Sequence, residues 1–380
     1  MAPASPLFAT LYGIAALAIA LLYFLPRRQS FVESLPPGPQ SPSMPTLDAW
    51  VQYQQWGKEY GELVYIRKHN MLIINNAHVA IDLLEKCACL YSDRPMTQVM
   101  KLCEADKILS IQKTGSGTSL IAELALENEG KPAEIKKIKA MGTVSFMAGA
   151  DTIMSAMSSF LLTMVQNSDV QSKARAEIDR VIGRDRLPMF EDRRSLPYVE
   201  SIYRKIMRMH PALPLGLFHV STEDDFYRVT IFLKVDVRSS PMSGEIMPGS
   251  LQVEARELKD IPRAMNRDPN VYSEPDTFKP ERFLDSPNRP FTSINNILAF
   301  GFGRRVCVGR YMADNTTWLA IASVLATLDL QKAKDSEGNE VDISGEYTRT
   351  FFRHPKPYQC SITPRDLQAR DSILATATAD

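Results

Sequence analysis

The sequence has few of the residues and patterns that several common functions need. Its 44 basic and 44 acidic side chains leave no net charge, which gives none of the basic excess that binds nucleic acid. Five scattered cysteines in 380 residues do not form a disulfide framework and suit a reducing compartment. No G-x-x-x-x-G-K-[ST] loop and no internal repeat occur. The 44% of hydrophobic residues is nevertheless typical of a folded globular protein.

Charge is also absent from one long stretch at the N-terminus. Leu7–Leu25 is apolar and about as long as a helix that crosses a bilayer. Arg27 and Arg28 follow, and no basic residue precedes, so the positive-inside rule places the rest of the chain in the cytosol. A cleaved signal peptide is the alternative, although the stretch lacks a basic leader and exceeds the usual length. We predict a membrane anchor over residues 1–34 and one folded domain over residues 35–380.

Helices dominate the predicted secondary structure, and short strand pairs lie toward the two ends. The apolar spacing and the positions of glycine and proline predict a hairpin of Glu62–Arg67 with Met71–Asn75 and a polar loop at Ala125–Glu134. The helices are predicted at Leu47–Tyr60, His78–Leu90, Ile135–Val165, Ser168–Gly183, Tyr198–His210 and Val308–Leu328. The expected fold class is therefore α+β, mainly α with small β-sheets.

The chemistry of the chain is concentrated in Ala299–Arg310, "AFGFGRRVCVGR", where one cysteine stands among three glycines and three arginines. A dinucleotide loop is excluded because Val306 takes the place of the third glycine. A zinc site lacks further ligands near Cys307, and a nucleophilic cysteine lacks an identifiable base. The pair Cys87-x-Cys89 could bind a metal but is more often a packing feature of a helix.

The interpretation that remains is a cysteine thiolate bound to haem iron. Glycines let the backbone approach the sulfur and the porphyrin closely, and the helix that follows directs its positive end toward the anion. Arg305 is placed to pair with a haem propionate. A thiolate donor increases the electron density on iron and so favours cleavage of the O–O bond.

This loop resembles the haem-binding signature of the cytochrome P-450 family. The matching positions are Phe300, Gly301, Gly303, Arg305, Cys307 and Gly309. The resemblance implies a P-450-like fold with haem (iron-protoporphyrin IX) as cofactor. It also implies that Cys307 is the axial ligand of the iron, and that Phe300, Gly303, Arg305 and Gly309 bind the cofactor.

Other segments support the resemblance. Ala148–Thr152, "AGADT", is similar to the oxygen-activation motif of the family's long central helix, which would make Thr152 and Asp151 a proton relay. Pro280–Phe283 resembles the loop that closes on the third helix. The tail His354–Arg365 resembles fungal microsomal members, the branch that contains O-methylsterigmatocystin oxidoreductase.

The chain also departs from the family. The third helix has Lys205 where the family's Glu-x-x-Arg has its acid, so Lys205, Arg208 and Arg282 would bring three cations together unless Glu200 or Glu281 replaces that acid. Lys205 could instead point to solvent, but the register of the helix argues against it.

The remaining departures are losses. Only 52 residues separate Pro95 from Ala148, where the family has the helices that cover the haem and the Trp-x-x-x-Arg propionate contact; the distal half is therefore expected to be incomplete. Val220 stands where the branch has another propionate-binding arginine, and Arg228–Arg263 is unlike the family's strands.

Two functional hypotheses follow. The first is a monooxygenase of the endoplasmic reticulum membrane that inserts one atom of O₂ into a small apolar substrate, in fungal secondary metabolism or detoxification. Its expected partners are NADPH-cytochrome P-450 reductase and membrane lipid, with no nucleic acid. The second is an inactive, truncated member of the family that binds haem weakly or not at all. Loss of the buried acid and of the haem-covering helices favours the second.

Overall fold

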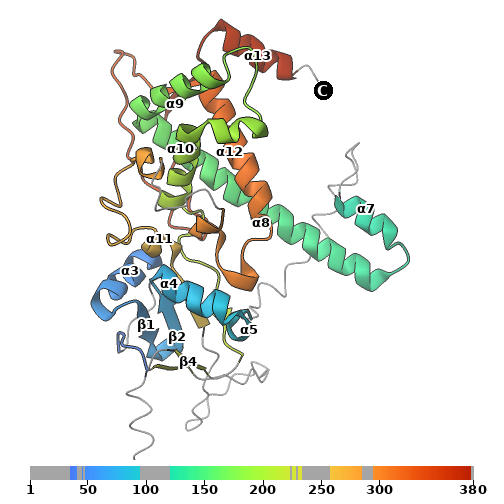
Figure 1. Cartoon of the computed structure of the whole chain (residues 1–380), viewed down its shortest axis with the longest axis vertical. Coiled ribbons are helices and arrows are strands. Elements are labelled where there is room, and N and C mark those ends of the chain that lie inside the picture. The colour runs from blue at the N-terminus through green and yellow to red at the C-terminus, as the bar shows by residue number, and fades with distance from the viewer. Residues whose placement is uncertain are drawn as a thin grey trace, which may run out of the picture.

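The computed structural model describes residues 35–40, 45, 48–94, 120–222, 225–227, 230–232, 257–284 and 294–377 (Figure 1). The predicted anchor lies outside these residues. Most of the described chain is helical, and the sheets are small, so the expected fold class is confirmed.

A four-stranded sheet forms one end of the molecule, at the bottom of Figure 1. The predicted hairpin is present as β1 (Leu63–Ile66) and antiparallel β2 (Met71–Ile74). Strand β6 (Glu257–Asp260) pairs in parallel with β2, and β3 (His219–Val220) pairs antiparallel with β6. Every β2 residue is buried, because the sheet packs between helices on both faces.

Short helices accompany this sheet. Tyr53 and Trp56 of α3 (Ala49–Tyr60) pack with apolar residues of β1 and β2. The predicted helix at His78–Leu90 is interrupted in the structure. It consists of α4 (Ala77–Ala80), a π-helical turn (Ile81–Lys86) and α5 (Ala88–Tyr91).

A helical core forms the rest of the molecule. Its elements are α8 (Pro132–Gln166), α9 (Ser168–Val181), α10 (Pro197–Met209) and α12 (Arg310–Thr327), each close to its predicted range. Fully buried side chains such as Phe160, Tyr203 and Trp318 join them into one apolar cluster. Glu177 of α9 accepts hydrogen bonds from the first N–H groups of α10, which positions the start of that helix.

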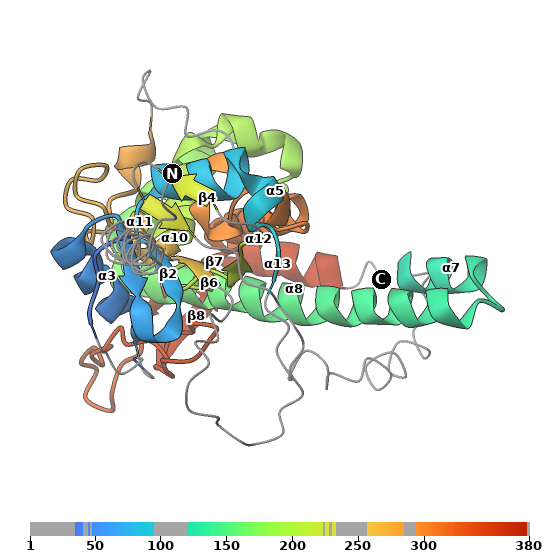
Figure 2. The ribbon, with the colours of Figure 1, turned by 90° about the horizontal axis from the view of Figure 1, so that it is seen from below.

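Helix α8 extends beyond this core and carries α7 (Leu120–Glu127) against its first turns (Figures 1 and 2). The predicted polar loop at Ala125–Glu134 is wrong in its extent, because α7 continues to Glu127 and proline starts α8 at its N-terminal turn. Among the described residues, α8 alone is long and apolar enough to cross a membrane, and 44% of its most apolar window is buried in protein.

The segment Arg228–Arg263, although unlike the family in sequence, forms strands at its described ends. Strand β4 (Asp225–Tyr227) pairs antiparallel with β5 (Thr230–Phe232), and β6 belongs to the main sheet. Helix α11 (Pro262–Met265) follows β6.

The tail returns to the helical core. Strand β7 (Leu328–Lys332) follows α12 and pairs antiparallel with β8 (Cys360–Pro364), and α13 (Leu367–Ala377) ends the described chain. Short 3-10 turns connect the elements. Arg67–His69 joins β1 to β2, and the others are Phe190–Ser195, Pro280–Phe283, Ile294–Asn296, Leu298–Phe300 and Gly303–Arg305.

Candidate cofactor site at the cysteine loop

The cysteine loop is closed by its own backbone. The N–H of Cys307 donates to the carbonyl oxygen of Phe300 at 2.8 Å, and the N–H of Val306 donates to Gly303 at 3.1 Å. Phe300 is buried in the helical core and holds the start of the loop there. These bonds curl the chain so that Cys307 stands at the outer side of the loop, just before α12.

Gly303 has a steric reason to be glycine. Its φ angle is +58°, and a Cβ on it would lie 1.7 Å from the carbonyl oxygen of Leu84. No side chain fits there without moving the backbone of the π-helical turn that contains Leu84. The close approach is therefore between the cysteine loop and the β-sheet end of the molecule, a contact that the sequence did not indicate. A Cβ on Gly309, in contrast, would meet no atom within 4 Å.

Cys307 is exposed, which is unusual because free cysteines are among the most buried residues of proteins. Its carbonyl oxygen accepts bonds from the backbone N–H and from Nη1 of Arg310, both at 3.3 Å. Helix α12 begins at Arg310, so its positive end lies next to the cysteine, as predicted. Val308, beside the cysteine, is 95% exposed.

Arg305 is exposed and anchored by one atom. Its Nε donates to the carbonyl oxygen of Ser92 at 2.6 Å. No described residue accepts a hydrogen bond from its two Nη groups, which are therefore available to an anion at the loop. Val220, where a second arginine was expected, is buried in β3, and its N–H donates to Asp93.

Asp151 and Thr152 lie on α8 and not in the cysteine loop. The hydroxyl of Thr152 donates to the carbonyl oxygen of Ala148 at 2.7 Å, and Asp151 is exposed. Within the described ranges, no hydrogen bond or ion pair joins either residue to the loop. A Cβ on Gly149 would meet nothing within 4 Å, so the helix surface is open there.

The unusual lysine of the third helix is buried, as the register of α10 predicted. Lys205 is 0% exposed, and its Nζ donates to the carbonyl oxygen of Thr277 at 2.5 Å. Arg208 donates to the carbonyl oxygens of Asn266 and Pro275. Burial, reinforced by the nearby arginines, lowers the pKa of Lys205 to about 6. The amine is therefore mostly neutral at pH 7.

Neither acid considered as a replacement pairs with Lys205. Glu200 binds Arg193 and Arg204, and Glu281 binds Lys173 and Tyr198. Backbone carbonyls take over part of the missing role, because Arg282 also donates to carbonyl oxygens, those of residues 273 and 274. The three basic side chains do come together as predicted, with Lys205 mostly neutral, and their hydrogen bonds end on the backbone of residues 266–277.

A second charged group near the loop was missed from the sequence. Arg193, in the 3-10 turn before α10, donates to Glu200 of α10 and to Asp314 of α12 at 2.6–3.2 Å. Burial alone would lower the pKa of Arg193, but these carboxylates outweigh it and raise the pKa above its ordinary value. The group ties α12, and with it the cysteine loop, to the third helix. Its partners lie too far apart in sequence for a local pattern to show them.

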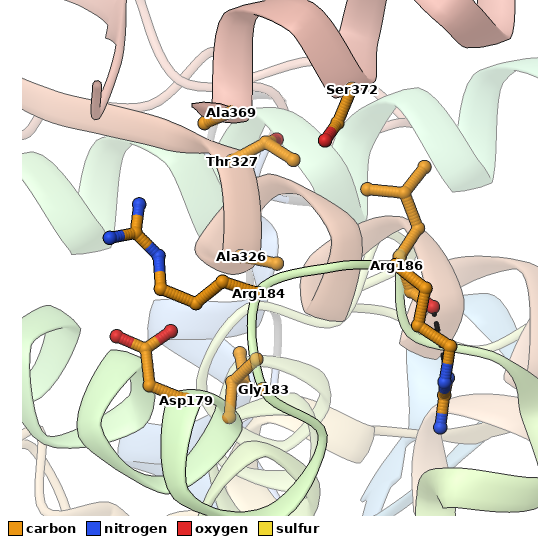
Figure 3. A pocket seen from close by; sticks show the side chains of 10 residues that line it. Asp179, Gly183, Arg184, Arg186, Ala326, Thr327, Ala369 and Ser372 are labelled. Carbon is orange, nitrogen blue, oxygen red and sulfur yellow. Dashed lines mark hydrogen bonds between the residues drawn. The ribbon is translucent and has the colours of Figure 1, made fainter. Parts of the chain in front are cut away.

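The pocket drawn in Figure 3 lies away from this site. It is lined by the end of α9, the end of α12 and α13, and includes Asp179, Arg184 and Ser372. Its charged side chains are already paired: Asp179 with Arg365, Arg184 with Asp366 and Arg186 with Asp192. No residue of the cysteine loop lines this pocket.

A family model matches most of the chain. The family model described as cytochrome P-450 matches residues 50–228 and 261–362. It omits residues 229–260, most of the segment that is unlike the family in sequence.

Two of the curated relatives illustrate the match, and both come from fungi. Cytochrome P-450 monooxygenase 136 of Postia placenta is 37% identical over 258 residues, 66% of this chain and 45% of the relative. Cytochrome P-450 monooxygenase claR of Ampulloclitocybe clavipes is 40% identical over 225 residues, 59% of this chain and 38% of the relative. The chain thus spans about half the length of the curated relatives it matches.

Solved structures share the fold. A zebrafish cytochrome P-450 with abiraterone superposes with a TM-score of 0.60 at 17% identity, covering 83% of this chain and 100% of that chain. The same kind of protein with progesterone gives a TM-score of 0.60 at 16% identity, covering 84% and 100%.

Proposed function

We propose that this chain, which belongs to the cytochrome P-450 family, acts as a haem-dependent monooxygenase that inserts one atom of O₂ into an apolar organic substrate. Haem held by a cysteine thiolate is the cofactor of this family. The observation that carries the proposal is the exposed Cys307 in a loop that the backbone closes around it.

The residues of the thiolate side fit haem. The sulfur is open to a ligand, Arg305 has unused donors, and Val308 and Met312 expose large apolar surfaces that a flat apolar group would cover. Phe146 and Met147, next to the "AGADT" motif on α8, are likewise exposed. When bound, haem supplies the activation of O₂.

We assign the following roles within the loop. Cys307 is the iron ligand, and it lies beside the positive end of α12 and the guanidinium of Arg310. Arg305 holds a propionate through its Nη groups while Ser92 fixes its Nε. Phe300 anchors the loop in the core, Gly303 lets its backbone pass close to Leu84, and Gly309 leaves open space for the cofactor.

On α8, we assign proton transfer to Thr152 and Asp151. The hydroxyl of Thr152 donates to the helix backbone in this structure, and rotation about χ1 would redirect its proton away from the helix. The exposed carboxylate of Asp151 can take up a proton from water and pass it along the helix surface.

The natural setting follows from the same resemblance. We propose electrons from NADPH through a cytochrome P-450 reductase, and anchoring in the endoplasmic reticulum membrane by Leu7–Leu25 with the domain in the cytosol. A role in fungal secondary metabolism or detoxification fits the fungal relatives.

A second function, that of a family member without activity, is favoured by one observation. Lys205 is a buried base at the position of the family's acid, and no acid pairs with it among the described residues. Such a chain would keep the fold and lose the cofactor.

Carbon monoxide difference spectroscopy of the full chain, expressed with haem supplied, separates the two. We expect the red-shifted band of a thiolate-ligated ferrous haem, its loss in Cys307→Ala, and its retention in the matched exposed-cysteine control Cys89→Ala. Absence of the band in the wild-type protein would refute the monooxygenase, and its survival in Cys307→Ala would refute the ligand assignment.

A further inference from the structure

We propose that a pocket beside α10 binds a small carboxylate anion, at a site distinct from the cysteine loop. Arg204 and Arg208 line it from α10, and Asn266 lines it from the loop after α11. Residues 296–298, which lead into the cysteine loop, form another wall, and Met207, Tyr272 and Phe283 complete the lining. The proposal does not depend on the monooxygenase function.

The pocket contains more positive charge than the chain neutralises. Arg204 and Arg208 are four residues apart on one helix face and only 6% and 4% exposed, and like charges at this spacing repel. Arg204 shares its acid, Glu200, with Arg193. Arg208 makes no ion pair with any described residue, and its Nη groups are occupied by backbone carbonyls.

Two buried donors in the same pocket have no partner. They are Nε of Arg208 and Nδ2 of Asn266, a residue that is 3% exposed. Leaving a buried donor unpaired is unfavourable, whereas a carboxylate offers one oxygen to each donor and a charge to the guanidinium. Burial lowers the pKa of Arg208 to about 10, in keeping with a cation that lacks an anion.

The chemistry of the walls selects the anion. Met207, Ile297 and Leu298 form an apolar side of the pocket, and the cavity of about 20 Å³ leaves room there for no more than a methyl group such as that of acetate. Phosphate would bring a second charge and further oxygens, for which these apolar walls supply no donors. The pocket therefore matches a monocarboxylate of one or two carbons.

Thermal unfolding of the full chain tests the site, with acetate as probe and acetamide as its neutral analogue at constant ionic strength. At a hundredfold excess over Kd we expect acetate to raise Tm by about 2 °C or more, and acetamide to leave it unchanged. The shift should disappear in Asn266→Leu. It should persist in Arg282→Gln, which removes an arginine that also binds the 266–277 backbone but does not line the pocket.

Equal shifts with acetate and acetamide, a larger shift with phosphate, or retention of the acetate shift in Asn266→Leu would each overturn the proposal. If Asn266→Leu does not fold, the site is tested by the NMR line width of ¹³C-acetate mixed with the wild-type protein. Saturable broadening of the acetate signal supports the site if formate reverses it and acetamide does not. Absence of such broadening overturns the proposal.

Discussion

Replacing Lys205 by methionine removes a buried amine and leaves a side chain of similar length and shape in the packing of α10. The pKa of Lys205 falls from an ordinary value of 10.5 to about 6, because burial and the neighbouring Arg208 and Arg282 disfavour its charged form. At pH 7 the folded chain therefore holds the amine neutral, whereas the unfolded chain protonates it. At about 1.4 kcal/mol per pKa unit, this difference costs the folded state about 5 kcal/mol.

The substitution also has a cost. The carbonyl oxygen of Thr277 loses its donor, which destabilises the folded state by about 1–3 kcal/mol. We therefore expect Lys205→Met to raise the free energy of unfolding at pH 7 by about 2–4 kcal/mol, the gain in charge minus the lost hydrogen bond.

The gain should depend on pH. Between pH 6 and 10.5 the unfolded chain holds one more proton on Lys205 than the folded chain, so wild-type stability rises with pH across this window. The advantage of Lys205→Met should shrink accordingly, and by pH 9.5 the two proteins should be about equally stable or the variant slightly less stable.

Urea unfolding at pH 6, 7 and 9.5 measures this difference, and the control is Lys173→Met, a half-exposed lysine paired with Glu281. A difference between wild type and Lys205→Met that stays constant across these pH values would refute the reasoning. Lys205→Glu, which restores an acid beside Arg208 and Arg282, should be more stable than wild type at pH 7 and should retain more haem.

Two further predictions concern contacts that hold the cysteine loop. Gly303→Ala should lower the free energy of unfolding by at least about 3 kcal/mol, because φ is positive there and the new Cβ would clash with the carbonyl oxygen of Leu84. Urea unfolding measures this loss, and Gly309→Ala is the control because its Cβ would meet nothing within 4 Å. An equal loss of stability in the two variants would contradict the steric argument. Arg193→Met should lower the free energy of unfolding by about 3–5 kcal/mol, because it leaves Glu200 and Asp314 without their cation. The control is Arg186→Met, which breaks the more exposed pair of Arg186 with Asp192 and should cost about 1 kcal/mol or less. A similar loss of stability in both variants would show that burial of the Arg193 group does not matter.

Local patterns in the sequence were enough to predict most helices and the first hairpin. The apolar spacing of α8, α9, α10 and α12 has the period of a helix, and the prolines and glycines beside them mark where they end. The cysteine loop was recognisable for the same reason, since its glycines, Arg305 and Cys307 all lie within one short segment. Strand β6 was missed because it forms by pairing with β2, far away in the chain.

The sequence by itself determined that Cys307 stands at the start of a helix. It also determined that the third helix has Lys205 in place of the family's acidic residue, and that this lysine faces inward. Only the tertiary structure decided what these residues contact. Gly303 packs against Leu84, Arg305 binds the carbonyl of Ser92, and Lys205 binds that of Thr277. Every residue has a backbone carbonyl, so the sequence does not show which of them will accept a hydrogen bond. The accepting residues are distant in the chain, by 72 residues for Lys205 and 213 for Arg305, so their role appears only when the chain is folded.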